Sequence, residues 1–146
     1  MKPLTHSDYR ALAELRYQLR KFLHFSEQAA RKAGMEPHQH QLLLALKGLP
    51  EGICPSMGAL ADRLQIEPHS AVELVNRLAK RGFVRRRRDG ADRREVQLIL
   101  TADGEKLLGE LSSHHREELQ TAGPALMAAL QAVLQSGKQR RNRRTT

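Results

Sequence analysis

The sequence contains very few aromatic residues and almost nothing that could cross-link it. Phe, Trp and Tyr together make up 3% of the 146 residues, and tryptophan is absent. Because 40% of the residues are nevertheless hydrophobic, the core must consist mainly of Leu, Val, Ile and Ala, a composition that favours helices. A single cysteine, Cys54, cannot form an internal disulfide, which is typical of a cytoplasmic protein.

Long apolar runs and catalytic motifs are also missing. The longest apolar run, residues 42–46, is far shorter than the roughly 20 residues that span a membrane. Residues 1–6 lack the apolar segment of a signal peptide. We therefore expect a cytoplasmic protein with no membrane partner. The absence of a glycine-rich phosphate loop, a nucleophile elbow and a His-Glu-x-x-His helix predicts that the protein is not an enzyme.

Basic residues outnumber acidic ones, and many of the basic residues lie in one segment. The chain has 25 Lys and Arg against 16 Asp and Glu, a formal net charge of +9. Such a balance indicates an anionic partner, which can be a nucleic acid, an anionic membrane or an acidic protein. Eight cations fall within residues 80–94: Lys80, Arg81, Arg85, Arg86, Arg87, Arg88, Arg93 and Arg94.

Hydrophobic periodicity predicts six helices. The first runs from about Thr5 to Gly34, and the second starts after Pro37. Ser56 caps a short third helix, and a fourth covers residues 68–81, with Pro68 in its first turn and Gly82 ending it. Thr101 caps a fifth helix, which we expect Gly123 and Pro124 to break before a sixth. The predicted buried positions of the third and fourth helices are Met57, Leu60, Ala61, Leu64, Ala71, Leu74, Val75 and Leu78.

The third and fourth helices, followed by a basic hairpin, form a pattern typical of DNA binding. Two short helices joined by a few residues, the second amphipathic, predict a helix-turn-helix. After it, Phe83–Arg86 and Glu95–Leu100 read as two strands around a turn rich in Asp and Gly. Arginines at a hairpin tip can follow a phosphate backbone or enter a minor groove. The alternative is a solvated charged edge that prevents sheet aggregation.

These segments resemble the multiple-antibiotic-resistance regulator (MarR) family. The resemblance is carried by residues 60–64 (Leu-Ala-Asp-Arg-Leu), by residues 71–84 and by the wing and following turn, residues 89–104. Its most specific part is an Asp-x-Arg pair followed by Leu-Thr-x-x-Gly. The resemblance implies a mainly α fold with a small β-hairpin wing, that is, a winged helix-turn-helix lobe joined to a helical dimerisation region. It also implies a homodimeric transcription regulator, usually a repressor, which binds a pseudo-palindromic site in double-stranded DNA.

The same resemblance divides the chain and assigns its DNA contacts. It implies one domain over 1–137, with the winged lobe at 37–104 and dimerisation helices at 5–34 and 101–136. A basic tail, 138–146, has no apolar residue and is expected to be disordered. The fourth helix, 68–81, is expected in the major groove and the wing, 85–97, in the minor groove. The DNA-contacting residues are His69, Ser70, Glu73, Asn76, Arg77, Arg86, Arg88, Arg93 and Arg94.

Two details of this assignment stay open. Asp92 is placed to orient Arg94 through a charge-assisted hydrogen bond, although a plain turn aspartate is the alternative. Glu73 stands where the family often has arginine, so the family's base preference cannot be carried over. A glutamate there repels phosphate unless it accepts from a cytosine amino group. Arg77 either contacts DNA or pairs within the protein.

The sequence also bears on whether the protein binds a small-molecule effector or a metal. The family often binds small aromatic or phenolic effectors between its dimer helices and its DNA lobes, and Tyr9, Tyr17, Phe22 and Phe25 either line such a pocket or form ordinary dimer core. The seven histidines lack an accompanying Cys-x-x-Cys pattern. We therefore interpret them as surface residues and expect no metal and no cofactor. The rival functions are a module for an acidic protein partner and a sequence-indifferent architectural DNA binder.

Overall fold

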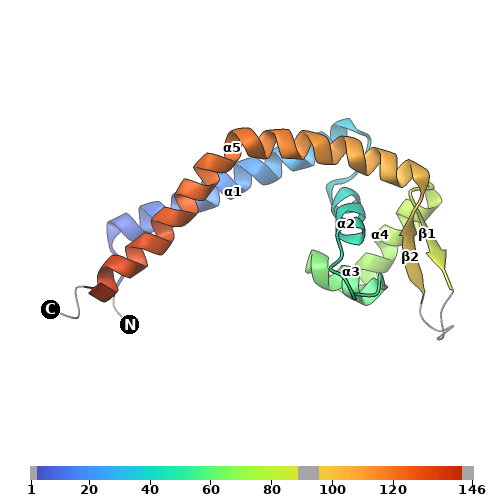
Figure 1. Ribbon diagram of the computed structural model, residues 1–146, viewed down its shortest axis with the longest axis horizontal. Coiled ribbons are helices and arrows are strands. Elements are labelled where there is room, and N and C mark those ends of the chain that lie inside the picture. Colours follow the sequence, from blue (N-terminus) through green and yellow to red (C-terminus); the bar gives the residue numbers. More distant parts are fainter. Residues whose placement is uncertain (1–2, 89–95, 143–146) are drawn as a thin grey trace. The chain divides into compact units, whose positions relative to one another are not determined.

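The computed structural model describes residues 3–88 and 96–142, with side chains up to residue 136. Along these ranges the chain forms α1 (His6–Lys32), α2 (Pro37–Lys47), α3 (Met57–Leu64), α4 (Pro68–Lys80), β1 (Val84–Arg87), β2 (Gln97–Leu100) and α5 (Ala102–Asn142) (Figure 1). The expected class, mainly helical with a small hairpin, is confirmed. Two compact units can be separated: a helical unit, residues 1–27 and 114–146, and a central unit, residues 28–113.

The central unit has an aliphatic core to which each of its elements contributes. Its members are Met35, Leu42, Leu43, Leu46, Leu60, Leu74, Val75, Leu78, Val84, Leu98, Leu108 and Leu111. The apolar stripe predicted for α4 is fully buried. In α3, Leu60 and Ala61 are buried, and Met57 and Leu64 pack against the core while half-exposed. The hydrophobic periodicity of the sequence therefore predicted correctly which faces of α3 and α4 are buried.

Local capping chemistry sets where these helices begin and end. Ser56 Oγ accepts a hydrogen bond from the Ala59 amide at 3.2 Å, as expected for an N-cap. At the end of α4, Gly82 has φ +79°, and the Phe83 amide donates to the Leu78 carbonyl at 3.0 Å. This is the geometry of a glycine-terminated helix. The helix end turns the chain directly into β1, so the wing starts at a fixed distance from α4.

The turn from β2 into α5 explains the Leu-Thr-x-x-Gly motif. Thr101 Oγ1 accepts from the Gly104 amide at 3.1 Å, which caps α5, and donates to the Gly82 carbonyl at 2.5 Å. The Thr101 amide donates to the Phe83 carbonyl at 3.1 Å. A Cβ on Gly104 would lie 2.1 Å from the Phe83 carbonyl oxygen. Only glycine therefore allows α5 to pack this closely against the junction between α4 and the wing.

The wing is an antiparallel pair of strands. Val84 lies opposite Leu100, and Arg86 lies opposite Leu98. Val84 and Leu98 are buried, whereas Arg85, Arg86 and Arg87 are exposed. The hairpin is thus anchored on the core by its apolar side chains and keeps its arginines at the surface.

The helical unit contains the first part of α1 and the last part of α5 (Figure 1). Thr5 and Asp8 cap α1 reciprocally: the Thr5 amide donates to the Asp8 carboxylate at 2.7 Å, and the Asp8 amide donates to Thr5 Oγ1 at 3.3 Å. The two helices meet where His115 Nε2 lies 2.7 Å from Ser26 Oγ. The interpretation of all histidines as surface residues is therefore wrong for His115, and also for His40, which is buried in the central unit.

The predicted break between a fifth and a sixth helix is wrong. The helix α5 is continuous from Ala102 to Asn142, with Pro124 inside it. An internal proline removes one hydrogen bond and costs about 3 kcal/mol, but it does not prevent a helix from continuing when good helix formers follow. Here Ala125–Ala129 contains Ala, Leu and Met, which are all strong helix formers.

The expectation of disorder from residue 138 onward is wrong for residues 138–142, which belong to α5. Lys, Gln and Arg have high helix propensity, and cations are favourable at a helix C-terminus. The absence of apolar residues there argues against packing, but it does not argue against helix. The remaining residues of the tail, 143–146, lie outside the described part of the chain.

Candidate nucleic-acid interface

The helix α4 presents a polar outer face opposite its buried stripe. His69, Glu73, Asn76 and Arg77 are exposed, and Ser70 is half-buried. Ser70, Glu73 and Arg77 line one hollow of about 230 Å³, together with Glu36, His38, Ile66 and Leu74. The structure therefore brings all five sequence-predicted residues of α4 to accessible positions. Which of them contacts DNA stays a prediction.

A side-chain contact joins the outer face of α4 to the wing. The Arg86 guanidinium donates through Nη2 to the Asn76 side-chain carbonyl. Both residues were predicted separately as DNA contacts, and the structure places them together. Because a guanidinium has five N–H donors in a rigid fork, Arg86 keeps donors for a phosphate while it is held by Asn76. The contact fixes the position of the Arg86 side chain relative to α4.

Arg77 is paired within the protein in the free chain. Its Nη1 lies 3.4 Å from the Glu36 carboxylate, and both side chains are largely exposed. An exposed ion pair of this kind contributes at most about 1 kcal/mol, so a DNA phosphate can compete for the guanidinium. Of the two roles left open by the sequence, pairing within the protein is thus present, and a DNA contact is compatible with it.

Arg81 has a structural role that the sequence did not indicate. Its Nη2 donates to the Gly34 carbonyl at 2.9 Å, and its Nη1 donates to Gln39 Oε1 at 3.1 Å. The guanidinium also lies 5.0 Å from the centre of the Phe83 ring. Its charge counts towards the basic segment 80–94, but these contacts tie the end of α4 to the turn before α2 and to the first turn of α2. Its partners lie more than 40 residues away, so no local pattern could reveal them.

Part of the predicted wing falls outside the described residues. Arg88, which follows the last residue of β1, is exposed, but Asp92, Arg93 and Arg94 lie in the range 89–95. The proposed orientation of Arg94 by Asp92 therefore stays a prediction.

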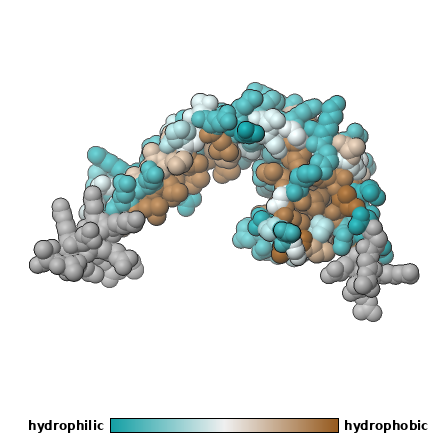
Figure 2. Space-filling model, in the orientation of Figure 1, coloured by the Kyte–Doolittle hydropathy of each residue, from teal (hydrophilic) through white to brown (hydrophobic). Residues whose placement is uncertain are grey.

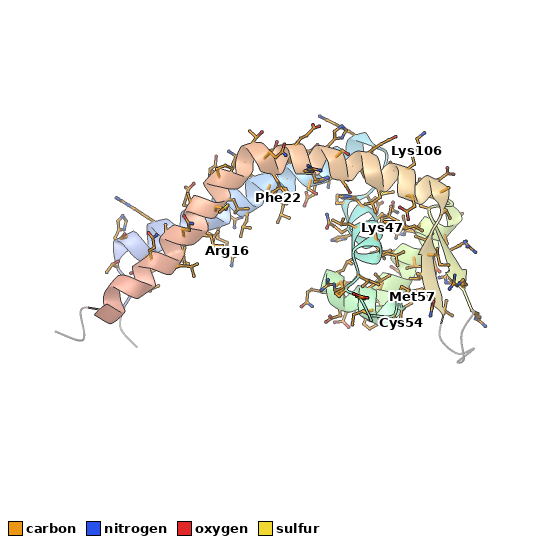
Figure 3. The ribbon with its side chains drawn as sticks, in the orientation of Figure 1. Arg16, Phe22, Lys47, Cys54, Met57 and Lys106 are labelled. Atoms are coloured by element: carbon orange, nitrogen blue, oxygen red, sulfur yellow. The ribbon has the colours of Figure 1, made fainter. Side chains whose placement is uncertain are left out.

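The four residues predicted to line an effector pocket differ in how exposed they are within the helical unit. Tyr9 and Tyr17 are 59% and 54% exposed, and the Tyr17 ring lies 5.4 Å from Lys21 Nζ. Phe22, labelled in Figure 3, and Phe25 are half-buried and meet the His115 ring edge-on, with centroids 6.4 and 5.9 Å apart. The sequence missed His115, whose only signal was its position on the predicted fifth helix.

The described residues, 3–88 and 96–142, contain neither a metal-binding cluster nor a membrane-spanning helix. No group of three or more His, Cys, Asp or Glu side chains is arranged there to hold a metal ion. No helix in these ranges has the length and apolarity needed to cross a membrane. Cys54 lies in the loop that leads into α3 (Figure 3).

Residues 33–95 match the sequence model of the MarR family. The matched range contains α2, α3, α4 and β1, which carry the polar face of α4 and the first strand of the wing. No curated protein matches the chain in sequence.

Solved structures share the fold over most of the chain. AbsC, a MarR family transcriptional regulator from Streptomyces coelicolor, matches with a TM-score of 0.70 and 21% identity, covering 84% of this chain and 82% of AbsC. A mutant of MepR from S. aureus bound to an oligodeoxyribonucleotide matches with a TM-score of 0.62 and 22% identity, covering 92% and 99%. BpsR from Bordetella bronchiseptica, whose DNA binding is regulated by 6-hydroxynicotinic acid, matches with a TM-score of 0.62 and 24% identity, covering 85% and 95%.

Proposed function

Because the chain carries a MarR-family segment at residues 33–95 within the fold of MarR regulators, we propose that it is a homodimeric transcription regulator that represses by binding a pseudo-palindromic operator. The observation that carries the proposal is the joined surface of α4 and the wing. The exposed polar face of α4 is linked to the arginine-rich strand β1 through Asn76 and Arg86. An α-helix fits the major groove, which is about 12 Å wide, and leaves a following hairpin near the adjacent minor groove.

The residues of this surface divide into base readers and phosphate binders. His69, Ser70 and Glu73, in the first turns of α4, face the base edges, and Asn76 and Arg77 lie farther along the helix towards the backbone. Arg77 leaves Glu36 for a phosphate when DNA binds. In the wing, Arg86, Arg88, Arg93 and Arg94 contact the backbone and the minor groove, and Asp92 orients Arg94. The cation-rich wing supplies the salt-dependent part of the affinity.

Dimerisation is supported by apolar side chains that the helical unit leaves exposed. On α1 these are Tyr9, Leu12, Tyr17, Leu19 and Leu23, and on α5 they are Leu119, Met127, Leu130 and Leu134. Figure 2 shows this hydrophobic surface over the helices of the unit. Monomeric proteins rarely leave so continuous an apolar patch in water. A second copy of the chain covers it through a two-fold interface.

The same helices would bind the effector. Phe22 and Phe25 offer half-buried aromatic faces, and His115 beside them offers a polar ring. A small aromatic ligand that favours one dimer geometry shifts the population away from the geometry that fits the operator. The similarity to BpsR, whose DNA binding responds to 6-hydroxynicotinic acid, supports this part of the proposal.

A salt titration with an Arg94→Ala variant tests DNA binding by this surface. Wild-type protein is expected to bind a labelled duplex with an affinity that falls steeply as salt rises, because neutralised phosphates release counterions. Arg94→Ala should weaken binding by about 10-fold and lower the log–log salt slope by about one. Arg16→Ala, which removes an exposed cation of α1 (Figure 3), should change neither.

The rival functions give different results in the same titration. A module for an acidic protein would show no measurable duplex binding even at low salt. Equal affinities of Arg94→Ala and wild type, with both folded and dimeric, would contradict the proposed role of the wing.

A further inference from the structure

One aliphatic side chain of α4 stands on the outer face of the helix. Val72 is 39% exposed, whereas Ala71, Leu74, Val75 and Leu78 are buried. Valine is a poorer helix former than alanine or the polar straight-chain residues, so it does not improve α4 as a helix. Val72 follows His69 by three residues and precedes Asn76 by four, a spacing that places the three on one face.

Glu73 stands beside Val72 and is also exposed. Within the part of the chain that the structure describes, no hydrogen bond or ion pair holds its carboxylate. The nearest guanidinium along the helix, that of Arg77, is directed to Glu36. The outer face of α4 therefore offers DNA one methyl-bearing side chain and one adjacent acceptor that has no partner within the described chain.

The major-groove edges of the four bases differ in their fit to this pair. A branched aliphatic side chain finds a hydrophobic partner in the C5-methyl group of thymine. A carboxylate needs a hydrogen-bond donor, and cytosine presents its N4 amino group without a neighbouring acceptor on the same base. Adenine also presents an amino group, but its N7 acceptor lies next to it and repels a carboxylate. Guanine presents acceptors alone.

We propose that Val72 and Glu73 determine the operator sequence by reading a thymine methyl group and a cytosine amino group in each half-site. The inference rests on the proposed function and adds the bases that α4 recognises. Consecutive residues differ by about 1.5 Å along a helix axis, less than the 3.4 Å spacing of base pairs. Because thymine and cytosine belong to different base pairs, the two are expected in adjacent base pairs of one half-site.

Chemical substitution in the DNA tests the role of Val72. The operator is first obtained by selection from a random duplex pool with wild-type protein, and each consensus thymine is then replaced by uracil, which lacks only the methyl group. Such a change in one half-site should weaken wild-type binding by about 4-fold. Val72→Ala should bind the thymine and uracil duplexes equally. Leu44→Ala, a matched removal of an exposed aliphatic side chain on α2, should keep the wild-type ratio.

Glu73→Gln tests the second contact. Wild-type protein should lose about 10-fold in affinity when the consensus cytosine pair is exchanged, and Glu73→Gln should lose much of that discrimination. Glu51→Gln, in the loop before α3, is the matched control. The inference is overturned if wild type binds a defined operator but uracil substitution has no effect at any position, or if the variants keep the wild-type base preferences. Failure to select any operator would instead contradict the proposed function itself.

Discussion

Gly104→Ala is expected to destabilise the central unit by at least about 3 kcal/mol. The added Cβ would lie 2.1 Å from the Phe83 carbonyl oxygen and 3.1 Å from the carbonyl carbon. Both atoms belong to backbone, so no side chain can rotate away. Moving Phe83 also breaks its hydrogen bond from the Thr101 amide, which holds β2 and α5 against the end of α4. The unfolding transition, followed by circular dichroism in urea, should shift to much lower denaturant.

Gly109→Ala is the matched control, because Gly109 lies on the same helix and nothing lies within 4 Å of its Cβ position. Alanine is the better helix former by about 1 kcal/mol, so this variant should be at least as stable as wild type. Equal stability of the two variants would contradict the close approach of α5 to Phe83. A stable Gly104→Ala protein would do the same.

The second large effect is expected at the exposed apolar face of the helical unit. Met127 and Leu134 are 62% and 58% exposed on α5 and lie seven residues apart, on one side of the helix. Replacing both with glutamate would place charges inside a dimer interface, where an unpaired buried charge costs several kcal/mol. The double variant should be monomeric by analytical ultracentrifugation at micromolar concentration.

Operator affinity should fall with the dimer. Two linked half-sites gain from effective concentration, which can raise affinity by about 10² or more over a single module. A monomer should therefore lose at least about 100-fold in operator binding while its central unit stays folded. Leu44→Glu, on an exposed position of α2, should remain dimeric. A double variant that sediments like wild type would refute the assignment of this face to a second copy.

Local rules predicted most of the fold correctly. The N-cap at Ser56, the proline in the first turn of α4 and the glycine that ends it each act within a few residues of their partners, so the sequence alone displays them. The same holds for the buried stripe of α4, because a helix repeats about every 3.6 residues. Pro124 shows the limit of such rules. The cost of a proline inside a helix predicted a break there, but α5 continues on both sides of Pro124.

The candidate site was less predictable, because its contacts join distant segments. Nothing near Arg81 indicates that it binds the Gly34 carbonyl, and the sequence shows it only as one of the eight cations of residues 80–94. The pairing of Asn76 with Arg86 depends on the angle at which β1 leaves α4. Val72 was missed for a different reason: the periodicity left it outside the buried stripe of α4, but the predicted DNA contacts were all polar side chains.

The central claim, that α4 and the wing of a dimer read a specific DNA sequence, is tested most directly by selecting bound duplexes from a random pool with the wild-type protein. We expect an enriched pseudo-palindrome whose half-site centres are about one helical turn apart, 10 to 10.5 base pairs, with a thymine and a cytosine in each half. Tight binding without any enriched sequence would instead identify an architectural DNA binder. Absence of duplex binding at low salt would contradict the claim altogether.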